Sequence, residues 1–403
     1  MISPRQYGVG RLCVEPTGTD ALAFRDRLAA GAERTLPQAT FAGLAGRALD
    51  KALLHRGFMR GTLPAALRPV ADAPRSAEDL HYWQFPARTE AAAHAVHAGM
   101  HTAHLEGNRV HVYLGLPWAT WIDYKGVHKS VPPGVEQELE MQRIRIQGLR
   151  RIWAEMGCKL RVHTVCQHIN WRRLVKSFSR VGVTDLWLSH APAPHEAGDV
   201  GKLALHPWRL YAANVEDPSR RRGLEMGKDP ATKPILASFI GAHQSYYLSD
   251  IRQRLQALAN EPGFLIEVND RWHFHEVVYE HQMRGKTLSQ SYRIDDTVER
   301  YNRILSDSVF SLCPSGSGPN SIRLWESLAV GSIPVLLGVE PVLPDVDRQG
   351  QKIPWDDVVI RAEATPVNRL PDILRVISLA ERRQRSDLSR QVFDQLAAKA
   401  CFG

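Results

Sequence analysis

Apolar and polar positions follow two different spacings from about residue 80 to the end of the chain. Short runs rich in β-branched or aromatic residues predict strands, and longer segments with apolar residues three or four positions apart predict helices. The strands expected from this pattern are 109–117, 160–169, 185–192, 235–242, 264–269, 308–314, 333–337 and 358–360. The helices expected are 133–157, a segment near 249–258, 321–330 and further helices to the end. Strands that alternate with helices predict parallel sheets with helices packed on them.

The alternation is interrupted at 214–234, where charged residues, Gly and Pro follow one another without periodicity, which predicts a linker. A chain of 403 residues is also longer than one hydrophobic core usually supports. We therefore expect an α/β protein with two Rossmann-like, doubly wound domains at 79–222 and 223–403. Residues 1–78 are predicted to be a partly helical N-terminal extension.

The extension contains a helical pattern at 41–61, in which basic residues are interspersed with leucines. Two interpretations are open for this helix. It packs on the main body with a solvated basic face, or it lies on a membrane surface.

Composition limits the class of protein and of partner. The chain is 44% hydrophobic and 23% charged, as globular proteins are, and 51 Lys and Arg against 43 Asp and Glu give a net charge of +8. This excess favours an acidic partner, such as a nucleotide sugar, an anionic glycan, nucleic acid or anionic lipid. The five cysteines are far apart and form no C-x-x-C, so the sequence indicates neither a disulfide framework nor a zinc ribbon.

No segment near the start resembles a signal peptide, and none approaches the roughly 20 apolar residues that span a bilayer. We expect a cytoplasmic protein, soluble or in peripheral contact with the inner face of the membrane.

A loop of small residues, "SGSGPNS" at 315–321, separates the expected strand 308–314 from the expected helix 321–330. In parallel sheets, ligands bind beyond the carboxyl ends of the strands, and loops that open onto a helix offer amide donors to anions. Gly316 and Gly318 permit close backbone approach, and Asn320 or Ser321 can cap the helix. The pattern predicts either a phosphate site or a plain strand-to-helix turn.

Arg323 and Glu326 lie one helical turn apart just after this loop. They form either a surface ion pair or part of a nucleotide site. In the second case the two oxygens of Glu326 accept hydrogen bonds from a ribose diol, and Arg323 orients Glu326 or meets a phosphate.

The run "YNRILSDSVFSLCPSGSGPNSIRLWESLAVGSIPVLL" at 301–337, followed by "VLP" at 342–344 and "DILRVI" at 372–377, resembles the exostosin family of glycosyltransferases, family 47. That family has an S-x-F-x-L-x-P-x-G strand and loop, an R-x-x-E-x-x-x-x-G helix and an I-P-V strand in the same order. "FIGA" at 239–242 and "IRQRL" at 251–255 resemble the first strand and helix of the same domain.

The resemblance implies a GT-B fold, in which two Rossmann-like domains face a cleft. The C-terminal domain would hold a nucleotide sugar, the N-terminal domain would hold the acceptor, and the anomeric carbon would be inverted. Glu326 would bind the ribose with support from Arg323, and Arg252 would neutralise the leaving group, with Arg254 as its competitor. The remaining donor-binding positions would be Gly241, Ser315, Gly316, Ser317, Gly318, Asn320 and Ser321.

An inverting transfer needs a base that takes the proton of the acceptor hydroxyl. Asp123 is the first candidate, because it lies in the tryptophan-rich segment 115–125, expected as a loop at a strand end. Trp118 and Trp121 of this segment either stack on a sugar or belong to the core. His168, at the end of the next expected strand, is the second candidate, and His190 is the third.

Metal ligands are not indicated. His273 and His275 alternate but lack further ligands at a diagnostic spacing. The "DVD" at 345–347 follows the Leu-Pro turn in a variable loop, so we interpret it as accidental. We expect no metal and no cofactor.

These features together predict an inverting, metal-independent glycosyltransferase of bacterial surface polysaccharide synthesis. Its donor would be a nucleotide sugar of the UDP type, and its acceptor an oligosaccharide or lipid-linked glycan. An epimerase or phosphorylase is disfavoured, since no cofactor lysine and no G-x-G-x-x-G is visible. The alternative is a non-catalytic protein that binds an anionic glycan or nucleic acid, although no compact motif interleaves aromatic and basic residues. The Arg220–Arg222 run is either a solvated linker or a contact for an anionic glycan.

Overall fold

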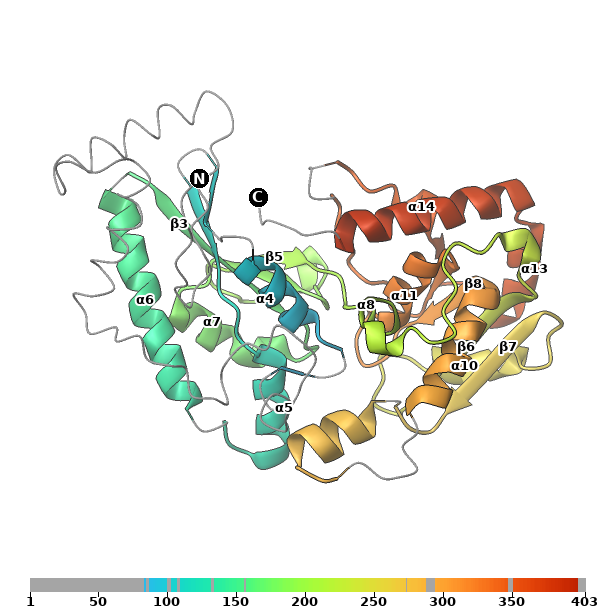
Figure 1. Cartoon of the computed structure of the whole chain (residues 1–403), viewed down its shortest axis with the longest axis horizontal. Coiled ribbons are helices and arrows are strands. Elements are labelled where there is room, and N and C mark those ends of the chain that lie inside the picture. The colour runs from blue at the N-terminus through green and yellow to red at the C-terminus, as the bar shows by residue number, and fades with distance from the viewer. Residues whose placement is uncertain are drawn as a thin grey trace.

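The computed structural model describes residues 83–84, 87–99, 103–106, 109–131, 134–155, 157–272, 274–287, 294–346 and 351–397. The predicted extension 1–78, with its helix at 41–61, lies outside these residues. Two lobes are present, each built around a five-stranded sheet that carries helices (Figure 1). The predicted fold class, α/β with two Rossmann-like domains, is confirmed.

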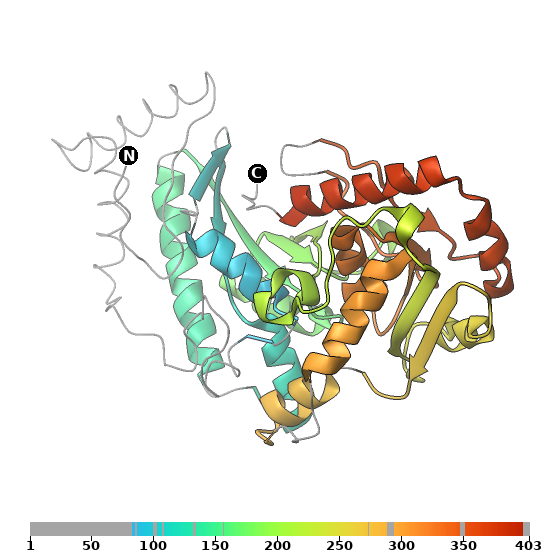
Figure 2. The same ribbon diagram turned by 45° about the vertical axis from the view of Figure 1, so that its right-hand side comes forward.

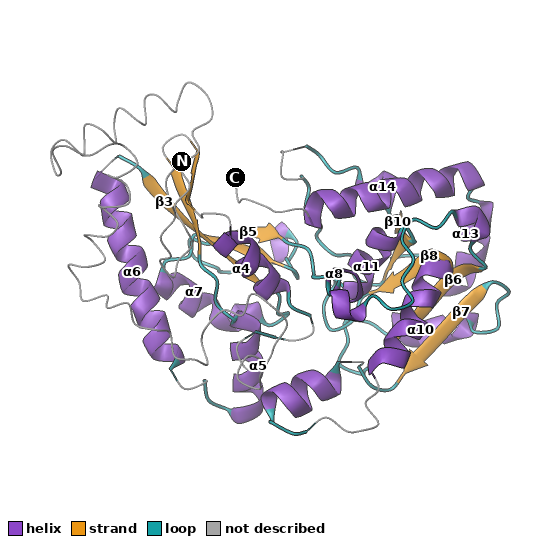
Figure 3. Cartoon of the chain, in the orientation of Figure 1, coloured by secondary structure: helices purple, strands orange, loops and turns teal. Residues whose placement is uncertain are grey.

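The N-terminal sheet has the strand order β1-β2-β3-β4-β5, in which β1 is antiparallel to β2 and the other pairs are parallel. Helices α5 and α6 connect β2 to β3, η2 and α7 connect β3 to β4, and α4 precedes β1 (Figure 3). The strands are Ala103–Glu106, Arg109–Tyr113, Lys159–Cys166, Asp185–Leu188 and Ala204–Pro207. The helices are α4 (Thr89–Gly99), α5 (Trp118–His128), α6 (Val135–Glu155), η2 (Trp171–Leu174) and α7 (Val175–Val181).

Side-chain alternation along these strands gives the sheet two packed faces. Val112, Val162 and Leu186 point into a core that α5, α6 and α7 complete. Tyr113 and Val165 point to the opposite face, where Ala93 of α4 packs against them. The connecting helices therefore cover one face, and α4 covers part of the other.

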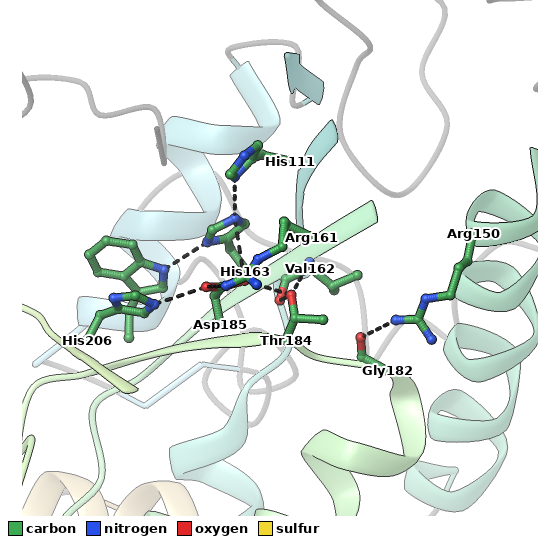
Figure 4. A network of polar contacts seen from close by, with 10 residues as sticks. His111, Arg150, Arg161, Val162, His163, Gly182, Thr184, Asp185 and His206 are labelled. Carbon is green, nitrogen blue, oxygen red and sulfur yellow. Dashed lines mark hydrogen bonds and ion pairs between the residues drawn. The ribbon is translucent and has the colours of Figure 1, made fainter. Parts of the chain in front are cut away.

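A row of polar side chains crosses the face that α4 partly covers (Figure 4). His163 Nε2 lies 2.8 Å from Nδ1 of His111, and Trp187 Nε1 donates to His163 Nδ1 at 3.0 Å. His206 Nε2 lies 3.0 Å from Asp185 Oδ1 on the neighbouring strands. Burial lowers the pKa of His163 to about 3, so this ring is neutral at pH 7. The row satisfies polar groups that the sheet buries.

The C-terminal sheet is fully parallel, with the strand order β10-β9-β8-β6-β7. The chain adds β7 on one side of β6 and then β8, β9 and β10 on the other side. The β6–β8 pair is therefore the topological switch point, where open α/β sheets bind ligands. The strands are β6 (Ile235–Ala242), β7 (Phe264–Asn269), β8 (Ser308–Pro314), β9 (Ile333–Leu337) and β10 (Ile360–Arg361). The helices are α9 (Ile251–Arg254), η6 (Leu255–Leu258), η7 (Glu276–Met283, a π-helix), α10 (Ile294–Asp307), α11 (Ile322–Val330), α12 (Trp355–Val358), η8 (Val367–Arg369), α13 (Leu370–Val376) and α14 (Leu379–Ala397).

Helices cover both faces of this sheet. Phe310 and Leu312 of β8 pack with residues of α9, η6 and α13, while Cys313 packs with residues of α11 and α14. In Figure 1, α14 runs along the outer side of this lobe, and α6 runs along the outer side of the other.

The segment 214–234 is not the irregular linker that the sequence predicts. It contains α8 (Ala213–Glu216), η4 (Pro218–Arg220) and η5 (Pro230–Thr232), and Val215 packs into the second core together with Leu210. Arg220 is 5% exposed and donates from Nε to Asn214 Oδ1 at 2.9 Å. The prediction of a solvated arginine run is therefore wrong at Arg220, because an amide and an aromatic ring, that of Phe274, take up its guanidinium.

The other two arginines of this run also have partners within the protein. Arg221 Nε donates to the carbonyl oxygen of Val215, and Arg222 Nε lies 2.5 Å from Glu299 Oε2.

Among the contacts that join the lobes, one lies near α8 and a second lies near α5. Near α8, Arg88 pairs with Asp217 at 2.8 Å, and the Tyr211 amide donates to Thr89 Oγ1 at 2.8 Å, so α4 lies beside the α8 segment (Figure 2). At the second contact, η7 reaches α5, where His128 Nε2 lies 2.7 Å from the carbonyl oxygen of Met283. Among the described residues, no helix is long and apolar enough to cross a membrane.

Candidate active site

A cleft of about 1000 Å³ lies between the two domains, at the carboxyl ends of both sheets. Two Rossmann-like domains that face a cleft are the arrangement that the predicted GT-B fold requires. Most of the predicted site residues line this cleft, namely Asp123, His168, His190, Gly241, Arg252, Gly316, Ser317, Gly318, Asn320, Ser321, Arg323 and Glu326. Two predicted donor-binding residues, Ser315 and Arg254, are absent from its lining.

Arg252 spans the switch point of the C-terminal sheet. Its guanidinium donates to the carbonyl oxygen of Ala242 at the end of β6 at 2.9 Å. It also donates to the carbonyl oxygens of Pro314 at 3.2 Å and Ser315 at 2.9 Å, at the end of β8. Burial lowers the pKa of Arg252 to about 10, so it remains charged at pH 7. Arg254, two residues further along α9, is exposed, so of the two competing arginines Arg252 is the one that faces the cleft.

The two glycines of the small-residue loop lie against charged and aromatic side chains. A Cβ on Gly316 would lie 2.7 Å from Nη2 of Arg252, and a Cβ on Gly318 would lie 2.3 Å from Nδ1 of His190. No side chain fits at either position without displacement of these groups. The backbone at both glycines thus makes the close approach that the sequence predicts. The groups that it approaches are side chains of both domains.

Polar residues of the loop have internal partners as well. Ser321 caps α11, since its Oγ accepts from the Leu324 amide at 3.4 Å. Asn320 Nδ2 donates to the carbonyl oxygen of Ser189 in the other domain at 2.7 Å, and its Oδ1 accepts from Trp325 Nε1 at 2.9 Å. The fully buried Ser315 accepts from the Val339 amide at 3.1 Å. Asn320 thus also joins the two domains.

The interpretation of Arg323 and Glu326 as a surface ion pair is wrong, because Glu326 is 2% exposed. Its Oε1 accepts from the Asn214 amide at 3.0 Å, and its Oε2 accepts from the Tyr301 hydroxyl at 2.8 Å. Burial raises the pKa of Glu326 above its ordinary value. Each oxygen keeps one further lone pair, so a contact with a ribose diol stays a prediction.

Arg323 lies over the ring of Phe239, 4.9 Å from its centroid, and over the ring of Tyr301, 5.1 Å from its centroid. It also donates to the carbonyl oxygen of Ile240 near the end of β6. Among the described residues, no carboxylate forms an ion pair with Arg323 or with Arg252. The charge of Arg323 acts instead on the buried Glu326, where it partly opposes the rise in the pKa of that carboxyl that burial causes.

Asp123 and His168 form a hydrogen-bonded pair on the opposite wall. His168 Nε2 lies 3.0 Å from Asp123 Oδ1, and the Asn170 amide donates to His168 Nδ1 at 2.9 Å. Because Nδ1 accepts, the proton of the neutral ring is on Nε2, which donates to the carboxylate. Asp123 Oδ2 accepts from Gln84 Nε2. In this arrangement His168 orients Asp123, and Asp123 is the group with lone pairs to offer.

The expected loop at 115–125 is instead the start of α5, and Asp123 is a helical residue. Trp118 is fully buried and Trp121 is 4% exposed, both within the core of the N-terminal domain. Trp118 Nε1 donates to Thr164 Oγ1 at 2.7 Å. These tryptophans therefore belong to the core and do not stack on a sugar.

Aromatic side chains at the Asp123 wall come from the other domain, which sequence reasoning missed. Tyr279 of η7 lies near Asp123, and burial followed by the charge of Asp123 raises the pKa of Tyr279 well above its ordinary value. Tyr279 therefore keeps its proton and can donate. Tyr246, which is 70% exposed, and Trp272 line the same cleft. For Trp272 and Tyr279, the signal in the sequence is the aromatic content of "RWHFHEVVYEH" at 271–281.

His190 lies where the two domains meet, beside Gly318. Its Nδ1 is buried and has no hydrogen-bond partner in the part of the chain that the structure describes. Burial lowers the pKa of His190 to about 3, so the ring is neutral at pH 7.

Residues considered as metal ligands fall in different places. His275 lines the cleft, with Nε2 3.9 Å from Glu280 Oε1, and His273 lies outside the described residues. Asp345 is exposed, and Asp347 of the same D-x-D also lies outside the described residues. Where the structure describes the chain, no group of three or more His, Cys, Asp or Glu is arranged to hold a metal ion.

Comparison with known families gives a match over residues 209–377, to the Exostosin GT47 domain. This confirms the predicted resemblance to exostosin-like glycosyltransferases for the C-terminal half. Curated relatives include a probable glucuronosyltransferase of Oryza sativa subsp. japonica, 39% identical over 87 residues, which are 21% of this chain and 19% of that protein. A probable beta-1,4-xylosyltransferase of Arabidopsis thaliana is 36% identical over 87 residues, 21% of this chain and 20% of that protein. The match thus spans about a fifth of these relatives.

Solved structures similar to this chain include the GtfA/B complex, with a TM-score of 0.32 and 12% sequence identity, covering 62% of this chain and 53% of that chain. Another is Anabaena HepE in complex with UDP and glucose, with a TM-score of 0.34 and 12% identity, covering 68% of this chain and 79% of that chain.

Proposed function

We propose that this chain, whose residues 209–377 match an exostosin-like GT47 domain, is a glycosyltransferase that moves a sugar from a nucleotide-sugar donor to a glycan acceptor. One observation carries the proposal beyond the family match. A single cleft has an oriented carboxylate, Asp123, on one domain and two guanidinium groups without ion-pair partners among the described residues, Arg252 and Arg323, on the other.

The C-terminal wall suits a diphosphate. Arg252 is held by carbonyl oxygens at the ends of β6 and β8, and no carboxylate among the described residues forms an ion pair with it. The start of α11, capped by Ser321, follows directly after the loop that contains Gly316 and Gly318, where there is no space for a side chain. A helix start and two arginines together favour an anion.

The N-terminal wall suits an acceptor hydroxyl. In the proposed reaction, Asp123 takes the proton of this hydroxyl, and the hydroxyl oxygen forms a bond to the anomeric carbon. The bond from that carbon to the donor phosphate oxygen breaks, and the electron pair leaves with the diphosphate, whose growing charge Arg252 stabilises. One displacement of this kind inverts the anomeric carbon and needs no covalent intermediate.

We propose that Arg252 and Arg323 fill the role that a metal has in other transferases. A UDP-type donor, an oligosaccharide or lipid-linked acceptor, and a place in bacterial surface polysaccharide synthesis at the inner membrane face remain predictions from the sequence; the curated relatives named above are plant proteins.

The test is incubation of the protein with a panel of nucleotide sugars, with and without oligosaccharides, and measurement of the nucleotide released. We expect slow hydrolysis of one donor, faster release with a suitable acceptor, and a raised melting temperature with that donor's nucleotide, since a ligand at about 100 times its Kd stabilises by ~2.7 kcal/mol. No release with any donor, together with salt-sensitive binding of DNA or an anionic glycan, would replace the proposal with the binding-protein alternative.

A further inference from the structure

A second buried carboxylate lies behind the Asp123–His168 pair. Glu90, in the first turn of α4, is 2% exposed, and the proposed reaction assigns no role to it. Both of its oxygens lie 3.1 Å from the amide nitrogen of Ala119, and Oε1 also accepts from the amide of Gln167 at 3.0 Å. Glu90 thus binds backbone groups of two other elements at once.

Those two amides belong to the segments that carry the pair. Ala119 is in the first turn of α5, one helical turn before Asp123, and Gln167 directly precedes His168 at the end of β3. A helix start offers unsatisfied amides, and a carboxylate is a strong acceptor for them. Through these bonds, one side chain holds the start of α5 against the end of β3.

Two glutamines extend this connection to the carboxylate itself. Gln167 Oε1 accepts from the Glu90 amide at 3.1 Å, and Gln167 Nε2 donates to Gln84 Oε1 and to the carbonyl oxygen of Ala87. Gln84 Nε2 then donates to Asp123 Oδ2. The orientation of each amide follows from its neighbour, so a continuous set of bonds runs from Glu90 to Asp123.

We propose that Glu90 and Gln84 are positioning residues for the transfer reaction. Glu90 holds α5 and the end of β3 so that His168 Nε2 meets Asp123 Oδ1, and Gln84 fixes Oδ2, which leaves the remaining lone pairs of Asp123 facing the cleft. The proposal rests on the proposed function, in which Asp123 takes the acceptor proton. Both residues lie outside the segment 209–377 that matches the family.

Titration of Glu90 makes the inference testable. Burial, with a smaller contribution from the charge of Asp123, raises the pKa of Glu90 to about 8, although interactions with the Gln167 and Ala119 amides and with Cys166 oppose this shift. The titratable groups that face Glu90 are Cys166 of β3 and Asp123 of α5. Burial raises the pKa of Cys166 well above its ordinary value, so it stays a thiol. Above pH 8 a new negative charge therefore arises beside Asp123.

The first experiment replaces Gln84 by methionine, which keeps the length of the side chain and removes the amide. We expect kcat for transfer to fall about 10- to 100-fold, the usual consequence of a slightly misplaced reactive group, with an unchanged donor KM. The matched control is Gln142→Met, which removes another buried glutamine of the same domain, whose Nε2 donates to Glu138 on α6. An unchanged kcat in Gln84→Met would remove Gln84 from the proposal.

The second experiment compares Glu90→Gln with Glu138→Gln over pH 6 to 9.5. Both wild-type carboxylates are 2% exposed and have pKa values that burial raises. We expect the wild-type transfer rate to show a step near pH 8 that Glu138→Gln keeps and Glu90→Gln lacks. A step that survives in Glu90→Gln, or is absent from the wild type, would overturn the role of Glu90.

A third measurement needs no sugar transfer. In protein labelled with ¹⁵N-histidine, with the His168 signals assigned through His168→Gln, we expect the Nε2–H form and a chemical-shift step near pH 8 that Glu90→Gln abolishes. This step without transfer from any donor would reject the proposed function and keep the connection from Glu90 to the pair. Transfer without this step would reject the connection and keep the function.

Discussion

The two sheets that meet at the cleft differ in how their strand order creates a binding edge. In the C-terminal sheet the order reverses between β6 and β8, so the carboxyl ends of these strands diverge, and Arg252 spans them through three carbonyl oxygens. In the N-terminal sheet the order follows the chain, and the segment after β2 turns directly into α5, which presents Asp123. The C-terminal binding edge is therefore a gap between two strand ends, and the N-terminal binding edge is the side of α5.

This difference accounts for the different roles of the two halves in the proposed reaction. A gap between diverging strand ends offers backbone groups and a helix start, which suit an anion. A helix side offers side chains alone, and these need partners that hold them in place. On the N-terminal side the partners are His168 and Gln84, and on the far side of the cleft Tyr279 is added from η7.

The largest effect is expected on the N-terminal side, at Asp123. Asp123→Asn keeps the size of the side chain and removes the proton acceptor, so transfer should fall about 10²- to 10⁴-fold while donor binding is unchanged. Steady-state kinetics and equilibrium nucleotide binding measure the two quantities. His168→Gln should reduce transfer less, because the imidazole orients the carboxylate. The reverse order of the two variants would move the base to His168.

On the C-terminal side, Arg252→Ala should lower kcat about 10²- to 10³-fold, as the loss of a group that stabilises leaving-group charge does, with a smaller change in donor affinity. Arg254→Ala is the matched control, since it removes an exposed arginine of the same helix. Nucleotide binding by the Arg252 variant shows that its domain is folded. Equal losses in both variants would contradict the assignment to the switch point.

Gly318 lies where the two domains meet. Gly318→Ala would place a Cβ 2.3 Å from His190 Nδ1 and 2.7 Å from Ile169 Cγ2. We expect it to destabilise the protein by about 1–3 kcal/mol, the usual cost of overpacking, and to widen the cleft. Gly148→Ala on α6, where a Cβ meets nothing within 4 Å, should be neutral or stabilising. Denaturant unfolding measures both. Equal stability of the two variants would show that the domains do not need this close approach.

A further effect is expected on how the free energy of unfolding depends on pH. The pKa of Glu90 is raised from 4.5 to about 8 in the folded protein, so the folded state binds the proton more tightly than the unfolded state. Stability from this group is complete below pH 4.5 and falls between pH 4.5 and 8, by at most about 1.4 kcal/mol per pH unit. Unfolding of Glu90→Gln should show a flatter dependence in this window. A wild-type curve that rises there, with no difference in the variant, would contradict the raised pKa.

Removal of divalent cations is expected to have the smallest effect. Because Arg252 and Arg323 are proposed to neutralise the diphosphate, transfer should be unchanged after treatment with EDTA. Loss of turnover that manganese restores would contradict this expectation and return attention to the D-x-D at 345–347.

By itself the sequence determined most of the C-terminal half. Strands at 235–242, 264–269, 308–314 and 333–337 have the predicted bounds, because continuous apolar runs between Gly, Pro and polar residues specify buried parallel strands locally. The cap at Ser321 and the approach at Gly316 and Gly318 were predictable for the same reason, since turn and cap chemistry acts over a few residues.

Only the tertiary structure decided the N-terminal wall of the cleft. The tryptophans around Asp123 belong to the core, the aromatic partner of Asp123 is Tyr279 of the other domain, and Glu90 reaches the pair through amides of α5 and β3. The bonds that orient Asp123 join residues distant in the chain, so no local spacing encodes them. Burial, which raises the pKa of Glu90, results from the packing of all these elements together, and no single segment contains it.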